Sequence, residues 1–267
     1  MAAASSGAGA HLGLPAMTGP EGFRFADDPL ADPVFRTAAP ESGEGPAAVC
    51  RDVVKTYRTA TESVTALDGV TLSIPRAQVT VVVGPSGSGK SSLLRLLACV
   101  DRPDAGEVRV AGRRVDALRA RARRGLRRRQ VAYLFQRPGE NLLPYLDAAG
   151  QIRLAAALRG MRISDDEIHA LLARMGLEAR ADHRPGQLSG GEQQRLAVAC
   201  GVVGGPALVV ADEPTAELDT AAAERVLTAM EDLAASGVGF VISSHDPRVM
   251  AIADGFVRLD HGRVVAA

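Results

Sequence analysis

An α/β fold with a largely parallel sheet is predicted by three features of this 267-residue sequence. Two uninterrupted apolar runs, VTVVV at residues 79–83 and ALVVAD at 207–212, are typical of strands buried on both faces of a sheet. Strand patterns and helix patterns alternate along most of the chain, as they do where helices connect parallel strands. A glycine-rich turn at residues 84–89 separates the first apolar run from an apolar helical segment.

The sequence of the N-terminal segment, residues 1–46, shows no pattern of helices or strands. It is rich in Ala, Gly, Ser and Pro and has no hydrophobic periodicity, so we expect residues 1–46 to be a disordered tail and residues 47–267 to form one folded domain. The segment also lacks the basic region and the sustained apolar core of a secretory signal peptide.

Each element of the folded part is predicted from its pattern and its end signals. Strands are expected at residues 48–57, 65–74, 79–83, 106–112, 131–135, 207–212 and 239–246, and in a terminal hairpin at 256–265. Helices are expected at residues 91–100, at about 116–129, across most of 137–187 and at 220–237. Ser164 and Glu167 have the spacing of a capping box, and Gly237 is placed to end the last helix.

Composition narrows the function before any motif is considered. The net charge is zero, which argues weakly against a dedicated nucleic-acid binder. The Arg cluster at residues 113–129 has no interleaved aromatics, so a solvated helix face is favoured over nucleic-acid binding, and contact with an anionic membrane stays open. Cys50, Cys99 and Cys200 lie far apart and imply no disulfide framework. The longest uncharged stretch, 196–211, is too short to span a membrane, so a membrane role would need a separate protein.

A phosphate-binding motif occupies the glycine-rich turn. Residues 84–91, GPSGSGKS, fit GxxxxGK[ST] between a predicted buried strand and a helix. Glycines let successive backbone N–H groups surround phosphate oxygens, while the helix directs its positive end toward the same anion. Lys90 would reach the β and γ phosphates, and the Ser91 hydroxyl would bind Mg²⁺. The alternative is a glycine-rich turn with an exposed lysine. The residues expected to contact the nucleotide are Gly84, Pro85, Ser86, Gly87, Ser88, Gly89, Lys90, Ser91 and Ser92.

An acidic strand end follows the second apolar run. The run delivers Asp212 and Glu213 to the carboxyl edge of the sheet, where open α/β sheets bind ligands. Asp212 would hold Mg²⁺ through water, and Glu213 would polarise the attacking water. Taken alone, this pattern is also compatible with a simple loop boundary; the phosphate motif makes the catalytic reading the stronger one.

A second helix start carries the octet LSGGEQQR at residues 188–195. Ser189, Gly190 and Gly191 would open a helix whose free N–H groups suit a second phosphate contact, and the alternative is an ordinary serine cap. Set between the phosphate motif and the acidic strand end, the octet closely resembles the signature of ABC ATPases.

Other positions match that family, and the resemblance implies a role for each. Tyr57 stands where an aromatic side chain stacks on adenine. Gln136 resembles the glutamine that touches Mg²⁺ near the γ-phosphate, and Asp219 the aspartate that contacts the opposite monomer. His245 resembles the switch histidine, and the resemblance implies that Glu213, His245 and Gln136 are catalytic. The alternative for His245 is a structural histidine at a strand end.

The resemblance covers residues 47 to 265 and implies a P-loop NTPase (RecA-like) core, an antiparallel β-subdomain and an inserted α-helical subdomain at about residues 137–195. It implies ATP and Mg²⁺ as ligands, and a homodimer or a pair of ATPase subunits closing on two ATP molecules. It also implies integral membrane permease partners and a cytoplasmic position on the inner face of the membrane. Within the family, KTYRTATESVTALDGV and HRPGQLSGGEQQR look like the subgroup that serves lipoprotein release, macrolide export and FtsE-type complexes.

The sequence departs from the subgroup at two places, and other functions within the family are also considered. The segment after Gln136 differs from the subgroup, which leaves the identity of the membrane partner open, and Cys200 replaces an arginine found in relatives. Instead of transport, the subunit could drive a membrane complex that activates a cell-wall hydrolase. DNA-repair ATPases and translation factors of this family are disfavoured because this chain is compact and has one such domain.

Overall fold

The structure is a computed structural model that describes residues 45–58 and 62–265. The predicted disordered tail therefore lies almost entirely outside the described residues. Among the helices of the described part, none is long and apolar enough to cross a membrane.

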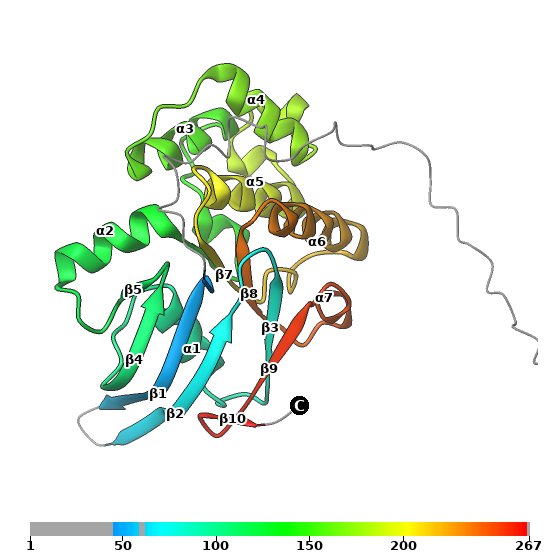
Figure 1. Ribbon diagram of the computed structural model, residues 1–267. Coiled ribbons are helices and arrows are strands. Elements are labelled where there is room, and N and C mark those ends of the chain that lie inside the picture. The colour runs from blue at the N-terminus through cyan, green and yellow to red at the C-terminus, as the bar shows by residue number, and fades with distance from the viewer. Residues whose placement is uncertain (1–44, 59–61, 266–267) are drawn as a thin grey trace, which may run out of the picture.

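A six-stranded sheet forms the centre of the molecule (Figure 1). Its order is β10-β9-β3-β8-β7-β6, with every pair parallel except the terminal hairpin of β9 and β10. The strands are β3 (Val79–Val83), β6 (Val131–Leu134), β7 (Leu208–Asp212), β8 (Gly239–Ser243), β9 (Gly255–Asp260) and β10 (Arg263–Val265). The predicted parallel sheet and the hairpin that turns at His261 and Gly262 are confirmed.

A second sheet is antiparallel and has four strands in the order β2-β1-β4-β5. These strands are β1 (Ala48–Arg58), β2 (Ser63–Ile74), β4 (Ala105–Val110) and β5 (Arg113–Arg114). Figure 1 shows this sheet on the side of the molecule away from α3 and α4. It corresponds to the antiparallel subdomain that the sequence predicts.

The helices connect these sheets and cover them. The longer ones are α1 (Lys90–Leu97), α2 (Ala120–Gln130), α3 (Ala148–Arg159), α4 (Asp165–Arg174), α5 (Gly190–Val202) and α6 (Thr220–Ala235), and α7 (Pro247–Ala251) is short. Single 3₁₀ turns occur at Pro138–Asn141, Glu178–Arg180 and Pro185–Gln187. In Figure 1, α3 and α4 project at one end of the molecule; the bounds proposed for an inserted subdomain, about 137–195, stay a prediction.

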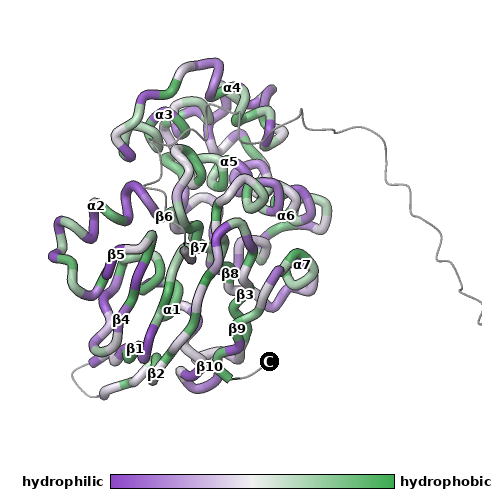
Figure 2. Tube along the Cα trace, viewed as in Figure 1, coloured by the Kyte–Doolittle hydropathy of each residue, from purple (hydrophilic) through white to green (hydrophobic). Residues whose placement is uncertain are grey.

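Alternate residues of the central strands enter two different cores. Val81 belongs to the core shared with α3, α4, α5 and α6. Its neighbour Val82 belongs to the core shared with α1 and the antiparallel sheet. Both faces of the strands are therefore buried, which explains their continuous apolar sequence, and apolar residues run along them in Figure 2. As a consequence, α1 and α5 lie on opposite faces of the sheet.

One helix prediction is wrong in its start. The Arg-rich helix begins at Ala120 and not near 116, because Asp116 is held in the turn after β5: its carboxylate accepts hydrogen bonds from Val108 N at 3.2 Å and Arg114 Nη2 at 2.6 Å. The stretch at 137–187 is helical over most of its length, as expected, and Gly160 ends α3 within it in a left-handed conformation at φ 82°. The capping box of Ser164 and Glu167 at the start of α4 is confirmed.

Candidate functional site

Strand pairing brings the predicted site segments to one edge of the central sheet. Ser243 at the end of β8 pairs with Val82 on one side and with Asp212 on the other. On the next strand, Leu134 pairs with Ala211. Parallel strands end at the same edge, so the glycine-rich loop after β3, the acidic end of β7 and the segments after β6 and β8 meet there.

Glycine is required at two points of the loop after β3. Gly84 has φ 151° and Gly89 has φ 103°. A Cβ atom added at Gly84 would lie 2.1 Å from the Leu259 carbonyl oxygen, and one at Gly89 would lie 2.3 Å from that of Ala66. Side chains at these positions would displace the surrounding backbone, so the sequence fixes the shape of the loop.

Inside this loop, Lys90 is hydrogen-bonded to backbone carbonyls, while the Ser88 hydroxyl is not hydrogen-bonded to any described residue. The Lys90 ammonium donates to the carbonyl oxygens of Gly84 at 2.8 Å and Pro85 at 2.9 Å. The Ser88 hydroxyl is buried, and no partner for it exists in the described part of the chain. Helix α1 starts at Lys90 without a side-chain cap. A buried hydroxyl, a lysine and an uncapped helix start at one place suit an anion with several oxygens. Pro85, Ser86 and Gly87 form the exposed tip of the loop.

Two oxygen ligands for a hard cation lie beside the loop. The Ser91 hydroxyl donates to Asp212 Oδ2 at 3.4 Å, and the Ser243 hydroxyl donates to Asp212 Oδ1. A hydroxyl and a carboxylate next to a phosphate site are the donors that Mg²⁺ uses together with substrate phosphates. The donor set therefore fits Mg²⁺.

Glu213 and His245 are in direct contact. His245 Nδ1 lies 2.8 Å from Glu213 Oε1, and the Ser244 hydroxyl donates to Glu213 Oε2 at 3.2 Å. The backbone of Glu213 is left-handed, with φ 46°, and its N–H donates to the Ser243 carbonyl at 3.0 Å. Such a conformation is uncommon for a residue other than glycine, and it turns the carboxylate toward the segment after β8. The Glu213 side chain is 17% exposed and the His245 side chain 88%.

Gln136 follows β6, the strand beside β7, and Tyr57 lies near the first turn of α1. Gln136 is exposed in the turn after β6, and Asn141 holds that turn: its Oδ1 accepts from Phe135 N at 2.8 Å and its Nδ2 donates to Phe135 O at 3.1 Å. The Tyr57 hydroxyl donates to Asp101 Oδ2 at 3.0 Å and interacts with Ser92 of α1. Burial and then the contact with Asp101 outweigh Ser92 and raise the pKa of Tyr57.

Ser189 and Asp219 stand at the starts of α5 and α6, two helices that pack together on the other face of the sheet. Ser189 caps α5 in a capping box with Glu192, and Asp219 caps α6 by accepting from Ala222 N at 2.8 Å. A Cβ atom at Gly191 would lie 2.6 Å from the Ala222 Cβ, so α5 and α6 meet closely at this point. Since α1 belongs to the opposite core, this group is separate from the phosphate loop of the same chain.

Sequence reasoning missed several residues that shape the site. Ser243 and Ser244 bind the two acidic side chains, and Asn141 holds the turn of Gln136. Asp246 accepts from Thr215 Oγ1 at 2.9 Å and binds Arg248, and these contacts lower the pKa of Asp246 to about 2, with the Arg248 hydrogen bond as the largest cause. The signal for Ser243 and Ser244 was their position at the end of a parallel strand beside Asp212.

Comparison with known proteins identifies the family. The ABC transporter family model matches residues 67–216. The lipoprotein-releasing system ATP-binding protein LolD of Chromohalobacter salexigens is 40% identical over 218 residues, which cover 80% of this chain and 91% of LolD. The macrolide export ATP-binding/permease protein MacB of Hahella chejuensis is 37% identical over 212 residues, and the match covers 79% of this chain but 32% of MacB. The chain thus spans about a third of that relative.

A solved structure gives the same result. The dimeric ATP-binding cassette MJ0796, in a post-hydrolysis state bound to ADP and Pi, superposes with a TM-score of 0.74 at 31% identity, covering 82% of this chain and 97% of that one. The predicted fold class and the similarity to lipoprotein-release and macrolide-export proteins are thereby confirmed. The chain belongs to the ABC transporter family, as an ATP-binding subunit with ATPase activity.

Proposed function

We propose that the edge of the central sheet binds ATP with Mg²⁺, and that two subunits complete two such sites and drive membrane permease partners. The observation that carries this proposal is the contact of Glu213 with His245, 2.8 Å apart, next to Asp212 and the phosphate loop. A base, a residue that orients it and a phosphate cradle at one place form the set needed for attack of water on a phosphoryl group.

The phosphates occupy the loop of residues 84–89 and the start of α1. Lys90 exchanges its present carbonyl partners, Gly84 and Pro85, for β and γ phosphate oxygens, which are stronger acceptors because they are charged. Ser88, Ser91 and Ser92 add hydroxyls along the first turn of α1. Tyr57 lies beside that turn through its contact with Ser92 and provides a ring for adenine.

Ser91 and Asp212 hold Mg²⁺, with Gln136 near the same position. The metal, when bound there, would supply positive charge next to the phosphates during transfer. Glu213 accepts a hydrogen bond from the attacking water and polarises it, while His245 and Ser244 fix the direction of the carboxylate.

Ser189, Gly190, Gly191 and Asp219 act on the nucleotide of the other subunit. They lie with α5 and α6, across the sheet from α1. A second subunit turned head to tail would present the start of its α5 to the γ-phosphate, where backbone N–H groups stabilise negative charge. The dimeric state of the MJ0796 cassette supports this arrangement.

The partners are integral membrane permease subunits, and the chain lies on the cytoplasmic face of the membrane that holds them. The names of the LolD and MacB relatives, a lipoprotein-releasing system protein and an ATP-binding/permease protein, support a transport role. The exposed Phe135 and Tyr145 beside the Gln136 turn, 45% and 65% exposed, provide apolar surface for such a partner.

The composite site is tested by mixing two inactive variants, Lys90→Ala and Ser189→Arg. Mixed dimers hold one site with both changes and one intact site, so ATPase activity should reappear and follow the fraction of mixed dimers. Ser164→Arg is the matched control, because Ser164 caps α4 through the same capping box as Ser189 does α5. If the Ser189→Arg chain alone dimerises and hydrolyses ATP at the unaltered rate, Ser189 is only a helix cap.

A further inference from the structure

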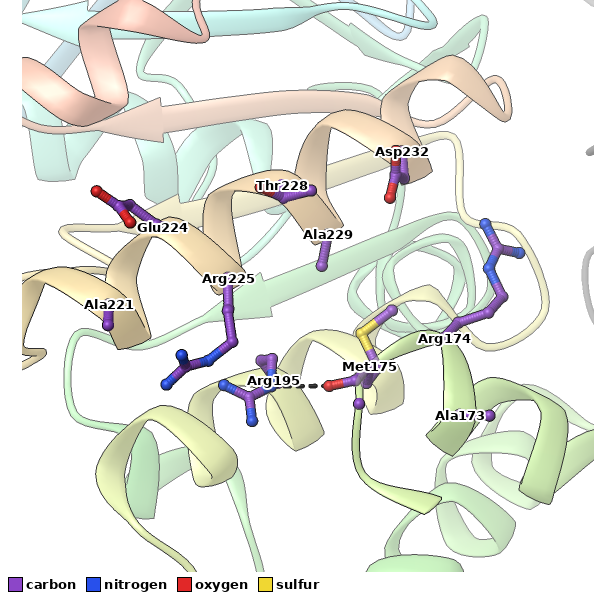
Figure 3. A pocket seen from close by; sticks show the side chains of 11 residues that line it. Ala173, Arg174, Met175, Arg195, Ala221, Glu224, Arg225, Thr228, Ala229 and Asp232 are labelled. Atoms are coloured by element: carbon purple, nitrogen blue, oxygen red, sulfur yellow. Dashed lines mark hydrogen bonds between the residues drawn. The ribbon is translucent and has the colours of Figure 1, made fainter. Parts of the chain in front are cut away.

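A pocket away from the nucleotide site lies between the α4–α5 region and α6. Its volume is about 370 Å³, within the range of small-molecule sites. Apolar groups line much of it, among them Ala173, Met175, Ala221 and Ala229. Figure 3 shows Met175 and Ala229 facing one another across it. This surface is suited to a short aliphatic chain.

A buried guanidinium group at this pocket lacks part of its hydrogen bonding. Arg195 is 7% exposed, and its Nε donates to the Met175 carbonyl at 2.7 Å. Its Nη1 atom is buried and has no hydrogen-bond acceptor among the described residues. Buried donors are normally paired, and an unpaired buried charge is costly, so this atom points to an acceptor that is not among the described residues.

The charges around Arg195 favour an anion. In Figure 3 the Arg225 side chain descends from α6 toward the Arg195 guanidinium, while Glu224 extends from the other side of the helix. Burial and then the positive charge of Arg225 lower the pKa of Arg195, and Glu192 opposes them. Glu192, however, already accepts from Arg180 at 2.9 Å and from Ser189 N at 2.8 Å. Arg195 and Arg225 thus lie near one another, and Glu192, the carboxylate whose charge acts on Arg195, is bound to other donors.

At the opposite end of the pocket, a positive and a negative side chain stand together. The pKa of Asp232 is raised by burial, and the positive charge of Arg174 partly opposes this shift. The unmatched positive charge is therefore concentrated at Arg195 and Arg225, one end of a pocket whose remaining wall is largely apolar.

We propose that this pocket binds a small aliphatic carboxylate, with its oxygens between Arg195 and Arg225 and its chain against Met175 and Ala229. Guanidinium groups bind carboxylates in bidentate fashion, and such a ligand would supply the acceptor that Arg195 Nη1 lacks. The ligand would join the α4–α5 region to α6. Because these helices start at Ser189 and Asp219, occupancy would modulate ATP hydrolysis from outside the nucleotide site.

Calorimetry with sodium hexanoate at millimolar concentration tests the proposal, because it needs no ATPase activity. Hexanoate should bind with one site per chain, while hexanol, of equal chain length but uncharged, should not bind. Arg225→Ala should weaken hexanoate binding by roughly tenfold or more, as expected for a lost charged hydrogen bond. Arg121→Ala, an exposed arginine of α2, is the matched control and should leave binding unchanged.

A charge reversal gives a second readout. Arg225→Glu places a carboxylate beside Arg195, so it should abolish hexanoate binding and raise the melting temperature by about 2–4 °C. The proposal is overturned if the unaltered chain does not bind hexanoate, or if Arg225→Ala binds it as tightly as the unaltered chain. It is also overturned if inorganic phosphate binds there and hexanoate does not.

Discussion

At the scale of single residues, neighbouring groups hold the charged side chains of the proposed nucleotide site. Lys90 is bound by two carbonyl oxygens of its own loop, and Asp212 by the hydroxyls of Ser91 and Ser243. These contacts keep the ammonium and the carboxylate beside the loop, where the proposed ligand would need them. The Glu213 carboxylate is likewise held from both sides by His245 and Ser244.

Lys90→Ala should abolish tight binding of Mg-ATP, because it removes the cation that lies inside the phosphate loop. We expect affinity to fall by roughly a hundredfold or more, measured by equilibrium titration with a fluorescent ATP analogue. Arg121→Ala, which removes an exposed cation of α2, is the control. Near-normal affinity in Lys90→Ala would refute the assignment of the loop.

At the scale of elements, individual hydrogen bonds join helices of different parts of the fold. Arg159, at the end of α3, donates from Nη1 to the carbonyls of Arg128 and Arg129 at the end of α2, and from Nη2 to Gly201 of α5 at 2.6 Å. One side chain thus connects three helices. Burial lowers the pKa of Arg159 to about 10, opposed by the neighbouring Cys200.

Arg159→Met should destabilise the fold by roughly 2–4 kcal/mol, because carbonyl groups at the ends of two helices lose their donor while the size of the side chain is nearly kept. Urea unfolding measures the change, and Arg162→Met, at an exposed position after α3, is the control. Equal midpoints for the two variants would show that Arg159 does not join these helices.

Two of the capping boxes have a serine cap, and substituting each serine distinguishes an effect on stability from an effect on function. Ser164→Ala and Ser189→Ala each remove a helix cap and should each cost about 1 kcal/mol in unfolding experiments. Only Ser189→Ala should also lower the ATPase rate, since Ser189 alone is proposed to reach the γ-phosphate of the opposite subunit. An equal ATPase rate in both variants would argue against that role.

At the scale of the whole molecule, strand order decides which residues meet. β8 lies between β3 and β7, so His245 necessarily follows a strand next to both the phosphate loop and the acidic pair. The same sheet separates α1 from α5, so the start of α5 lies apart from the phosphate loop of its own chain. A second subunit is therefore part of the proposed catalytic unit.

Local patterns predicted the parallel strands, the phosphate loop and both serine caps, because each depends on a few neighbouring residues. The contacts of Asn141 with the Gln136 turn and of Ser244 with Glu213 could not be predicted, since they depend on how loops bend at the sheet edge. The predicted start of α2 was wrong because Asp116 is held by a contact with a different element: its carboxylate accepts from Val108 N of β4. Tertiary contacts thus overrode the local helical pattern.

The central claim is that Glu213 activates water in a site closed by two subunits, and Glu213→Gln tests it most directly. The amide keeps the size of the side chain but cannot polarise water, so phosphate release should fall by roughly a hundredfold or more while ATP binding persists. Light scattering of the variant with Mg-ATP should then give the mass of a dimer. Glu178→Gln, changed at an exposed carboxylate in the 3₁₀ turn Glu178–Arg180, should behave as the unaltered chain. A Glu213→Gln chain that hydrolyses ATP normally and stays a monomer would contradict the account.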